Sequence, residues 1–216
     1  MDYLADPIGK LYKRLLPSAI GSMLTATVSS LLDAIVLSFY LGPVMLSSVS
    51  ICMPIYMVLN ALALLLVSGG VTLCAMYMGK GDLIESNRFF TVSVISVVFV
   101  GLVLTLVGNL FLEDIIFLLG ANDAVWQSTL DYARILMKFM IPLMLYCLML
   151  LFVRFDSEPA LSLAATGVCA GSNLVMNFVF IGFLDMGTAG AALATCLAYT
   201  IATGVGFTHF LKKKNT

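Results

Sequence analysis

Charged side chains are scarce in this sequence. Lys, Arg, Asp and Glu make up 11% of the 216 residues, whereas 61% of the residues are hydrophobic. A soluble domain carries about 25% charged residues, so this composition excludes a water-exposed surface and indicates a chain that lies in a lipid bilayer. The formal net charge of −1 gives no basic surface for nucleic acid.

Motifs for metal binding and catalysis are also missing. The number of cysteines is odd and no C-x-x-C occurs, which argues against a disulfide framework or a zinc site. The sequence contains no glycine-rich phosphate loop, nucleophile triad or cluster of metal ligands. We therefore expect neither an enzyme nor a resident cofactor. The cysteines all fall inside apolar runs, at Cys52, Cys74, Cys147, Cys169 and Cys196.

Long apolar stretches dominate what is present. A spanning helix needs ~20 mostly apolar residues, and six stretches satisfy this requirement. They cover about residues 15–41, 44–78, 89–112, 125–153, 160–184 and 188–211. The second stretch is long, and we interpret it as one helix that bends near Pro54 or Ser68-Gly69-Gly70 and overshoots the membrane. The prediction is an all-α integral membrane protein, with residues 1–216 forming a single six-helix lobe.

The positions of the basic residues decide between six and seven spans. With six spans and a cytoplasmic start, nine of the eleven Lys and Arg residues lie in inner segments, and the outer loops contain none. A seventh span would break this pattern, so the positive-inside rule predicts six spans with both termini cytoplasmic, in a multi-pass protein of the plasma membrane. The nine are Lys10, Lys13, Arg14, Lys80, Arg88, Arg154, Lys212, Lys213 and Lys214.

Polar residues of the first helix lie on one face. At ~100° per residue, an arc of about 80° contains Ser18, Ser22, Thr25, Ser29 and Asp33. An aspartate at the centre of a membrane helix costs about 2.5–3.5 kcal/mol by insertion scales. Asp33 is therefore a functional candidate, because an ionisable group inside a membrane needs water, a cation or a partner.

Two further helices have similar stripes. The fifth carries Ser162, Thr166, Asn173 and Asn177 on one face, and the sixth carries Thr188, Thr195 and Tyr199. Each stripe alone is also typical of hydrogen bonds between packed helices, and Gly167-x-x-x-Gly171 is typical of close helix packing. Three stripes and one acid favour a shared wet cavity. Oxygen ligands with one formal charge suit a monovalent cation or a proton better than calcium.

Several short motifs, in order and across nearly the whole chain, resemble the amino-terminal half of the multidrug and toxic compound extrusion (MATE) transporters. They begin with Leu16-Pro17-Ser18-Ala19-Ile20-Gly21, continue with Asp33, Gly42, Pro54-Ile55, Ser68-Gly69-Gly70, Gly79-Lys80-Gly81-Asp82, Leu119-Gly120-Ala121, Tyr132 to Ile135 and Arg154-Phe155-Asp156-Ser157-Glu158-Pro159, and end with Gly190-Ala191-Ala192-Leu193-Ala194-Thr195.

This resemblance implies twelve helices in two six-helix lobes around a central cavity, and export of cationic amphiphilic compounds in exchange for Na⁺ or H⁺. It implies that Asp33 binds the coupling ion, with Asn173 and Thr195 in the same cluster. Asn177 falls where many members carry a second aspartate, and Leu150 where some carry an asparagine. Both departures remove polarity from the ion site. The other polar residues expected to line the cavity are Ser22, Thr25, Ser29, Thr166 and Tyr199.

Two questions about a single lobe are open: what covers its polar stripes, and what the lobe does. The polar stripes would face lipid at a cost of several kcal/mol per unsatisfied group, so we expect a second lobe or a second copy of the chain as partner. The leading hypothesis is half of a multidrug antiporter. One alternative is a half-length, non-transporting membrane subunit or remnant. Another is a lipid-linked saccharide flippase of the same superfamily, whose anionic substrates would favour arginines on the cavity stripes, where we find none.

Overall fold

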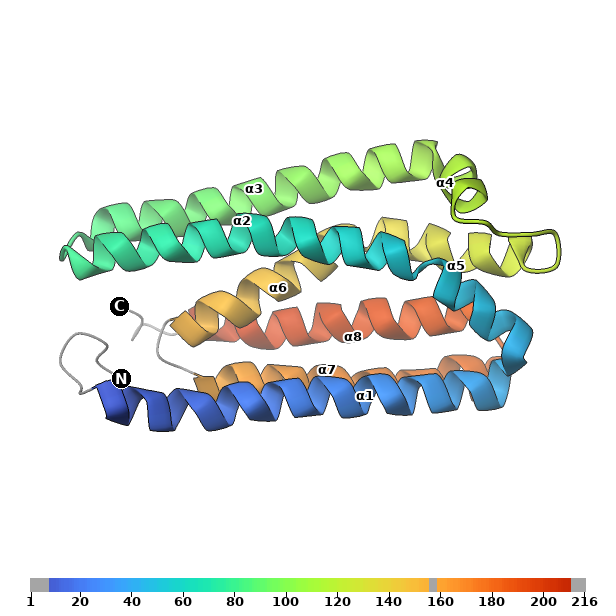
Figure 1. Ribbon diagram of the computed structural model, residues 1–216, viewed down its shortest axis with the longest axis horizontal. Coiled ribbons are helices and arrows are strands. Elements are labelled where there is room, and N and C mark those ends of the chain that lie inside the picture. Colours follow the sequence, from blue (N-terminus) through green and yellow to red (C-terminus); the bar gives the residue numbers. More distant parts are fainter. Residues whose placement is uncertain (1–7, 156–158, 211–216) are drawn as a thin grey trace.

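The computed structural model describes residues 8–155 and 159–210, which form a bundle of long helices without a strand among them (Figure 1). The expectation of an all-α membrane protein is thereby confirmed. Five of these helices are long and apolar enough to cross a membrane, and the bent pair α5–α6 would be a sixth span. The elements are α1 (Ile8–Ile51), α2 (Met53–Gly79), α3 (Leu83–Leu110), α4 (Leu112–Leu118), α5 (Trp126–Lys138), α6 (Met140–Phe155), α7 (Pro159–Asn177), the π-helical turn η1 (Phe178–Phe183) and α8 (Gly187–Phe210).

The first two predicted helices meet at Gly42. This residue has φ +74°, a left-handed conformation that glycine adopts without a steric penalty, and it separates a long arm of α1 from a short outer arm. The predicted helix 44–78 is not continuous, because the chain turns again at Cys52 before α2 begins. Pro54 lies in the first turn of α2, where its missing N–H costs no helical hydrogen bond.

The predicted helix 125–153 is also divided in the structure. Helices α5 and α6 meet at Phe139 with a bend of 56°. Pro142 explains the break, because it has no N–H to donate to the carbonyl oxygen of Lys138 four residues earlier. The bend directs α6 away from α5, towards the end of the bundle where α1 begins and α8 ends (Figure 1).

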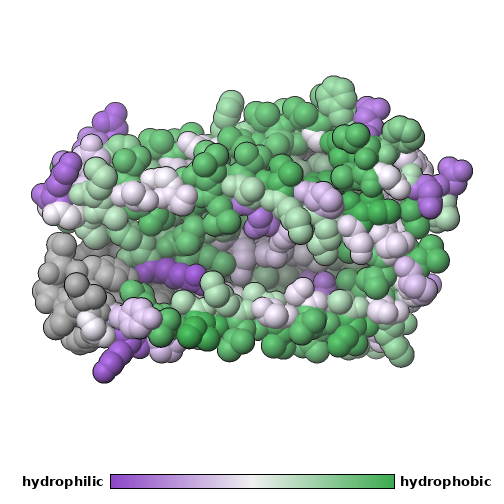
Figure 2. All heavy atoms as spheres, in the orientation of Figure 1, coloured by the Kyte–Doolittle hydropathy of each residue, from purple (hydrophilic) through white to green (hydrophobic). Residues whose placement is uncertain are grey.

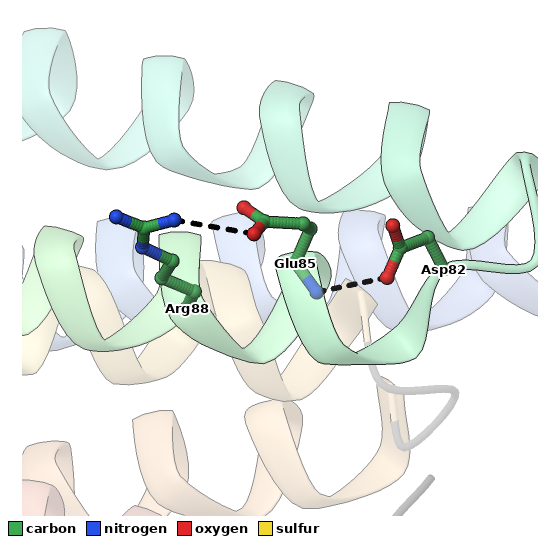
Figure 3. Close-up of polar contacts among 3 residues, drawn as sticks. All are labelled: Asp82, Glu85 and Arg88. Carbon is green, nitrogen blue, oxygen red and sulfur yellow. Dashed lines mark hydrogen bonds and ion pairs between the residues drawn. The ribbon is translucent and has the colours of Figure 1, made fainter.

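Helix α3 begins six residues before the predicted start at 89. Asp82 caps it, since its carboxylate accepts a hydrogen bond from the backbone N–H of Glu85 at 3.1 Å. One turn later Arg88 donates to the Glu85 carboxylate at 3.2 Å (Figure 3). These polar contacts lengthen the helix beyond its apolar core. The turn before Asp82 lies at the same end of the bundle as the start of α1 and the end of α8 (Figure 1).

Small residues allow close packing at specific places. Ala191, Ala192, Ala194 and Ala198 of α8 are buried, with exposed fractions of 2% or less. We expected Gly167 and Gly171 to allow close packing against another helix. Within the lobe this is wrong, because both are exposed and a Cβ added to either would meet no atom within 4 Å.

Gly70 and Gly69 provide a matched test of helix packing. A Cβ at Gly70 would lie 1.9 Å from Ser93 Oγ and 2.9 Å from Ser93 Cβ, whereas a Cβ at Gly69 would meet nothing within 4 Å. Overpacking costs about 1–3 kcal/mol, so Gly70→Ala should lower the apparent melting temperature of the purified protein by several degrees. Gly69→Ala should leave it unchanged or raise it, because alanine favours a helix by about 1 kcal/mol over glycine. Equal melting temperatures for the two variants would contradict the close contact of α2 with α3.

Candidate ion and substrate cavity

A cavity of about 620 Å³ lies between α1, α2, α5, α6, α7 and α8. This volume is in the usual range of small-molecule sites, about 300–1,000 Å³. In Figure 2 a hollow runs between α1 and α2, and hydrophilic side chains are visible inside it. Among its lining residues are Ser22, Ser29 and Asp33 of α1, Thr166 and Asn173 of α7, and Thr195 and Tyr199 of α8.

The three predicted stripes meet in a chain of hydrogen bonds at the wall of this cavity. Asn177 Nδ2 donates to Asp33 Oδ1 and, at 3.2 Å, to Asn173 Oδ1. Asn173 Nδ2 donates to Thr195 Oγ1 at 3.2 Å, and Thr195 Oγ1 donates to the backbone oxygen of Ala191 at 3.1 Å. The sequence therefore predicted the four residues that come together here, from α1, α7 and α8.

The spacing within α7 produces this arrangement. Asn173 and Asn177 are four residues apart, so their side chains lie on one face of the helix. Directly after Asn177 the chain widens into the π-helical turn η1. Single π-helical turns are frequent at functional sites. Asn177 is fully buried behind the cavity wall, whereas Asp33 is half-buried and lines the cavity.

One acceptor of this cluster is unused. Both N–H bonds of the Asn177 amide are occupied, but Asn177 Oδ1 is buried and has no hydrogen-bond partner among the described residues. Leaving a buried polar atom unpaired costs about 1–3 kcal/mol. Asp33, Asn173 and Thr195 place further oxygens nearby, so the donor set is one of hard oxygen ligands with a single formal charge. Such a set fits a monovalent cation.

Thr25 does not line the cavity, contrary to expectation. Its hydroxyl donates to the backbone oxygen of Gly21 at 2.8 Å. The residues of α1 that do line the cavity include Ala26 and Ser30. At ~100° per residue, the centre of the cavity-facing arc lies near Asp33 and Ala26, which leaves Thr25 on the flank of the helix. The other four polar residues expected to line the cavity do so.

Four tyrosines line the cavity, and sequence reasoning assigned only Tyr199. Tyr56 donates a hydrogen bond to the Tyr199 hydroxyl, and the Tyr146 ring meets the Tyr199 ring edge to face with centroids 4.8 Å apart. Tyr132 of α5 is the fourth. Aromatic faces attract cations, and this effect grows where water is excluded. The tyrosines come from four helices, so no spacing in the sequence reveals the group.

Arg154 also lines the cavity, which corrects the expectation that no arginine would do so. Its Nε donates to Ser162 Oγ at 2.8 Å. Ser162 and Asn177 are fifteen residues apart on α7, so the guanidinium of Arg154 and the carboxylate of Asp33 are separated by roughly 22 Å along that helix. Leu150 lines the cavity one turn before Arg154.

Comparison with known proteins finds relatives along most of the chain. The MatE family model matches residues 17–179. The chain is 28% identical over 200 residues to the multidrug export protein MepA of Staphylococcus haemolyticus and 24% identical to MepA of Staphylococcus aureus strain MRSA252. In both cases the match covers 93% of this chain and 44% of the relative, so the chain spans less than half the length of these proteins.

Solved structures show the same arrangement of helices. The chain superposes on an outward-facing multidrug resistance MATE family transporter of the MOP superfamily with a TM-score of 0.86, at 25% identity over 94% of this chain and 45% of that one. For an inward-facing MATE family transporter the TM-score is 0.81, over 88% of this chain and 43% of that one. These proteins are named as transporters and export proteins, in agreement with the expectation that the chain is not an enzyme.

Cysteine labelling tests whether the cavity is open to water. Cys169 lines the cavity and is partly exposed, whereas Cys196 is fully buried and does not line it. A brief treatment of native membranes with a small hydrophilic thiol reagent should therefore modify Cys169 at least about tenfold more than Cys196, because reactivity requires access. Peptide mass spectrometry measures both sites in the same sample. Equal modification would show that the cavity is dry or closed.

Proposed function

The chain belongs to the MatE family of membrane transporters, and from this premise we propose that it is the amino-terminal lobe of a secondary active multidrug efflux antiporter. It would export cationic amphiphilic compounds in exchange for Na⁺ or H⁺. The observation that carries the proposal is the hydrogen-bonded chain from Asp33 through Asn177 and Asn173 to Thr195, beside a cavity with an aromatic wall.

Asp33 would hold the coupling ion. The side-chain amide of Asn177 would rotate, so that its oxygen rather than its N–H group faces Asp33. In the structure, Asn177 donates its amide N–H groups to Asp33 and Asn173, and its own oxygen has no partner among the described residues. Rotation of the amide by half a turn would present Asn177 Oδ1 to a cation at Asp33. A protonated Asp33 could donate to the same oxygen. An asparagine can serve both states because it carries a donor at one end and an acceptor at the other.

Coupling requires that the ion stabilises one cavity orientation more than the other. Asp33 lies on α1 and accepts a hydrogen bond from Asn177 of α7, and Asn173 of α7 bonds in turn to Thr195 of α8, so filling the site would change the contact of α1 with α7 and, through it, with α8. Cationic compounds would contact the tyrosine wall and, when the coupling ion is absent, the Asp33 carboxylate. Competition for one carboxylate gives exchange of ion for drug.

Arg154 favours a second candidate, a flippase for lipid-linked saccharides, because a guanidinium in the cavity can bind a phosphate. Asp33 lies on the wall of the same cavity, however, and would repel an anion. The antiporter therefore remains the better-supported proposal.

We further propose that the lobe lies in the plasma membrane with the start of α1 and the end of α8 on the cytoplasmic side. The turn with Lys80 and the exposed Arg88 lie at this end of the bundle, as the positive-inside rule requires. The partner that completes the cavity would be a second six-helix lobe, supplied by more of the same polypeptide or by a second copy.

Asp33→Asn and Asn177→Leu test the ion site. Asp33→Asn removes the only acid on the cavity wall among the described residues, so we expect loss of ²²Na⁺ binding to the purified protein and loss of dye export from cells. Asn177→Leu should weaken binding about tenfold, since it removes one oxygen ligand, a loss of ~1.4 kcal/mol. Asp131→Asn is the control, because Asp131 accepts from Gln127 on the exposed side of α5.

The coupling ion need not be sodium for this test to decide. If export runs on a proton gradient without Na⁺, Asp33→Asn should still abolish it while Asp131→Asn does not. Normal export by Asp33→Asn at normal expression would contradict the proposed role of Asp33.

The two-lobe proposal has its own measurement. Native mass spectrometry of the exporting protein in lipid nanodiscs should give the mass of one polypeptide about twice as long or of two copies of this one, which corresponds to twelve spanning helices. Export by a single six-helix unit would contradict the proposal, because its polar stripes would then face lipid.

A further inference from the structure

A second cavity, of about 260 Å³, lies between α2, α3, α4 and the junction of α5 with α6. It shares no lining residue with the central cavity. Its walls are made almost wholly of carbon and sulfur atoms, from Pro54, Ile55, Val58, Leu59, Leu104, Val107, Gly108, Ile115, Leu119, Met137 and Met140.

The rim of this cavity is continuous with the lipid-facing surface of the lobe. Val58 of α2 and Val107 of α3 are 59% and 47% exposed, and both lie on helices apolar enough to cross the membrane. Val58 is five residues from the start of α2 and Val107 three from the end of α3, so the rim lies roughly 5–8 Å from the ends of these two helices. The entrance therefore opens to the bilayer at the level of one leaflet, below α4.

The helix α4 closes the top of the cavity. Ile115 and Leu119, one turn apart, face into it, and Phe117 and Leu118 are 75% and 85% exposed. Large exposed apolar side chains on a helix that follows a spanning segment are typical of an element at the membrane interface. The floor is tightly packed, since a Cβ at Gly108 would lie 2.4 Å from the sulfur of Met137.

The chemistry of the walls defines the occupant. A buried water needs two to four polar partners, and these walls offer almost none, so the cavity takes an apolar guest. In a bilayer the neighbouring apolar groups are the acyl chains of phospholipids. We propose that this cavity between α2, α3 and α4 is a binding site for the acyl chain of a phospholipid from the adjacent leaflet.

The site lies directly behind the wall of the central cavity. Leu136 lines the central cavity, and the next residue, Met137, lines the apolar one. Met137 and Met140 flank the bend at Phe139, and methionine side chains adapt to irregular guests. A bound acyl chain fills the space behind the bend and so supports the tyrosine-bearing wall that α5 and α6 present to the central cavity.

Photocrosslinking with a matched pair of variants tests the site. The purified protein is placed in phosphatidylcholine nanodiscs that contain a small fraction of phosphatidylcholine with a diazirine near the end of one acyl chain. Mass spectrometry then locates the label. We expect it to concentrate on Leu104, Ile115, Leu119 and Met137, over Leu102, which is 46% exposed but does not line the cavity.

Val107→Trp fills the entrance, and Val103→Trp is its control one turn away on the same helix. Val103 is 41% exposed and lies outside the cavity. We expect Val107→Trp to reduce labelling of the cavity residues at least fivefold and Val103→Trp to leave it unchanged. Labelling spread evenly over all exposed apolar residues, or equal labelling of the two variants, would overturn the proposal. So would labelling only by a free fatty acid with the same diazirine.

Discussion

The structure depends on one constraint: a carboxylate within a membrane helix must have polar partners. Asp33 is held by Asn177, and the same amide reaches Asn173, which in turn reaches Thr195. Three helices are thereby joined through side chains, in a medium where an unpaired polar group costs several kcal/mol. The buried alanines of α8 let the helices come close enough for these bonds. The network uses both N–H groups of Asn177, one of them on the Asp33 carboxylate, and leaves the buried Asn177 oxygen without a partner among the described residues.

Interruptions of the helices create the central cavity of the lobe. Straight helices of this length would pack side by side, but Gly42, Cys52 and Phe139 each interrupt a predicted helix. The turns at Gly42 and Cys52 carry the chain from α1 across to α2, and the bend at Phe139 carries α6 from the upper layer towards α8 (Figure 1). The cavity lies between the layers that these breaks separate. Proline accounts for the bend at Phe139, and a positive φ for the turn at Gly42.

Much of this could be predicted from the sequence, because a membrane leaves few options. Apolar stretches predict spans, and an acid in such a stretch predicts a polar cluster. Helical periodicity placed Asp33, Asn173, Asn177 and Thr195 correctly, but it failed for Thr25, since a stripe drawn through the residues of one helix says nothing about where the neighbouring helices lie. The start of α3 was missed because Asp82 and Glu85 extend the helix beyond its apolar part. The tyrosine wall was missed for another reason: each tyrosine comes from a different helix, and only the fold brings them together.

The charges on the cavity wall fit the exchange that we propose. Among the lining residues that the structure describes, Asp33 and Arg154 are the charged ones, and they lie roughly 22 Å apart along α7. At that distance they do not neutralise each other directly. In the proposed antiporter, a coupling ion or a cationic compound would in turn supply the positive charge that pairs with Asp33. With an asparagine at position 177, the cluster carries one formal negative charge, that of Asp33. In the antiporter that we propose, ion and drug would therefore compete for this one carboxylate.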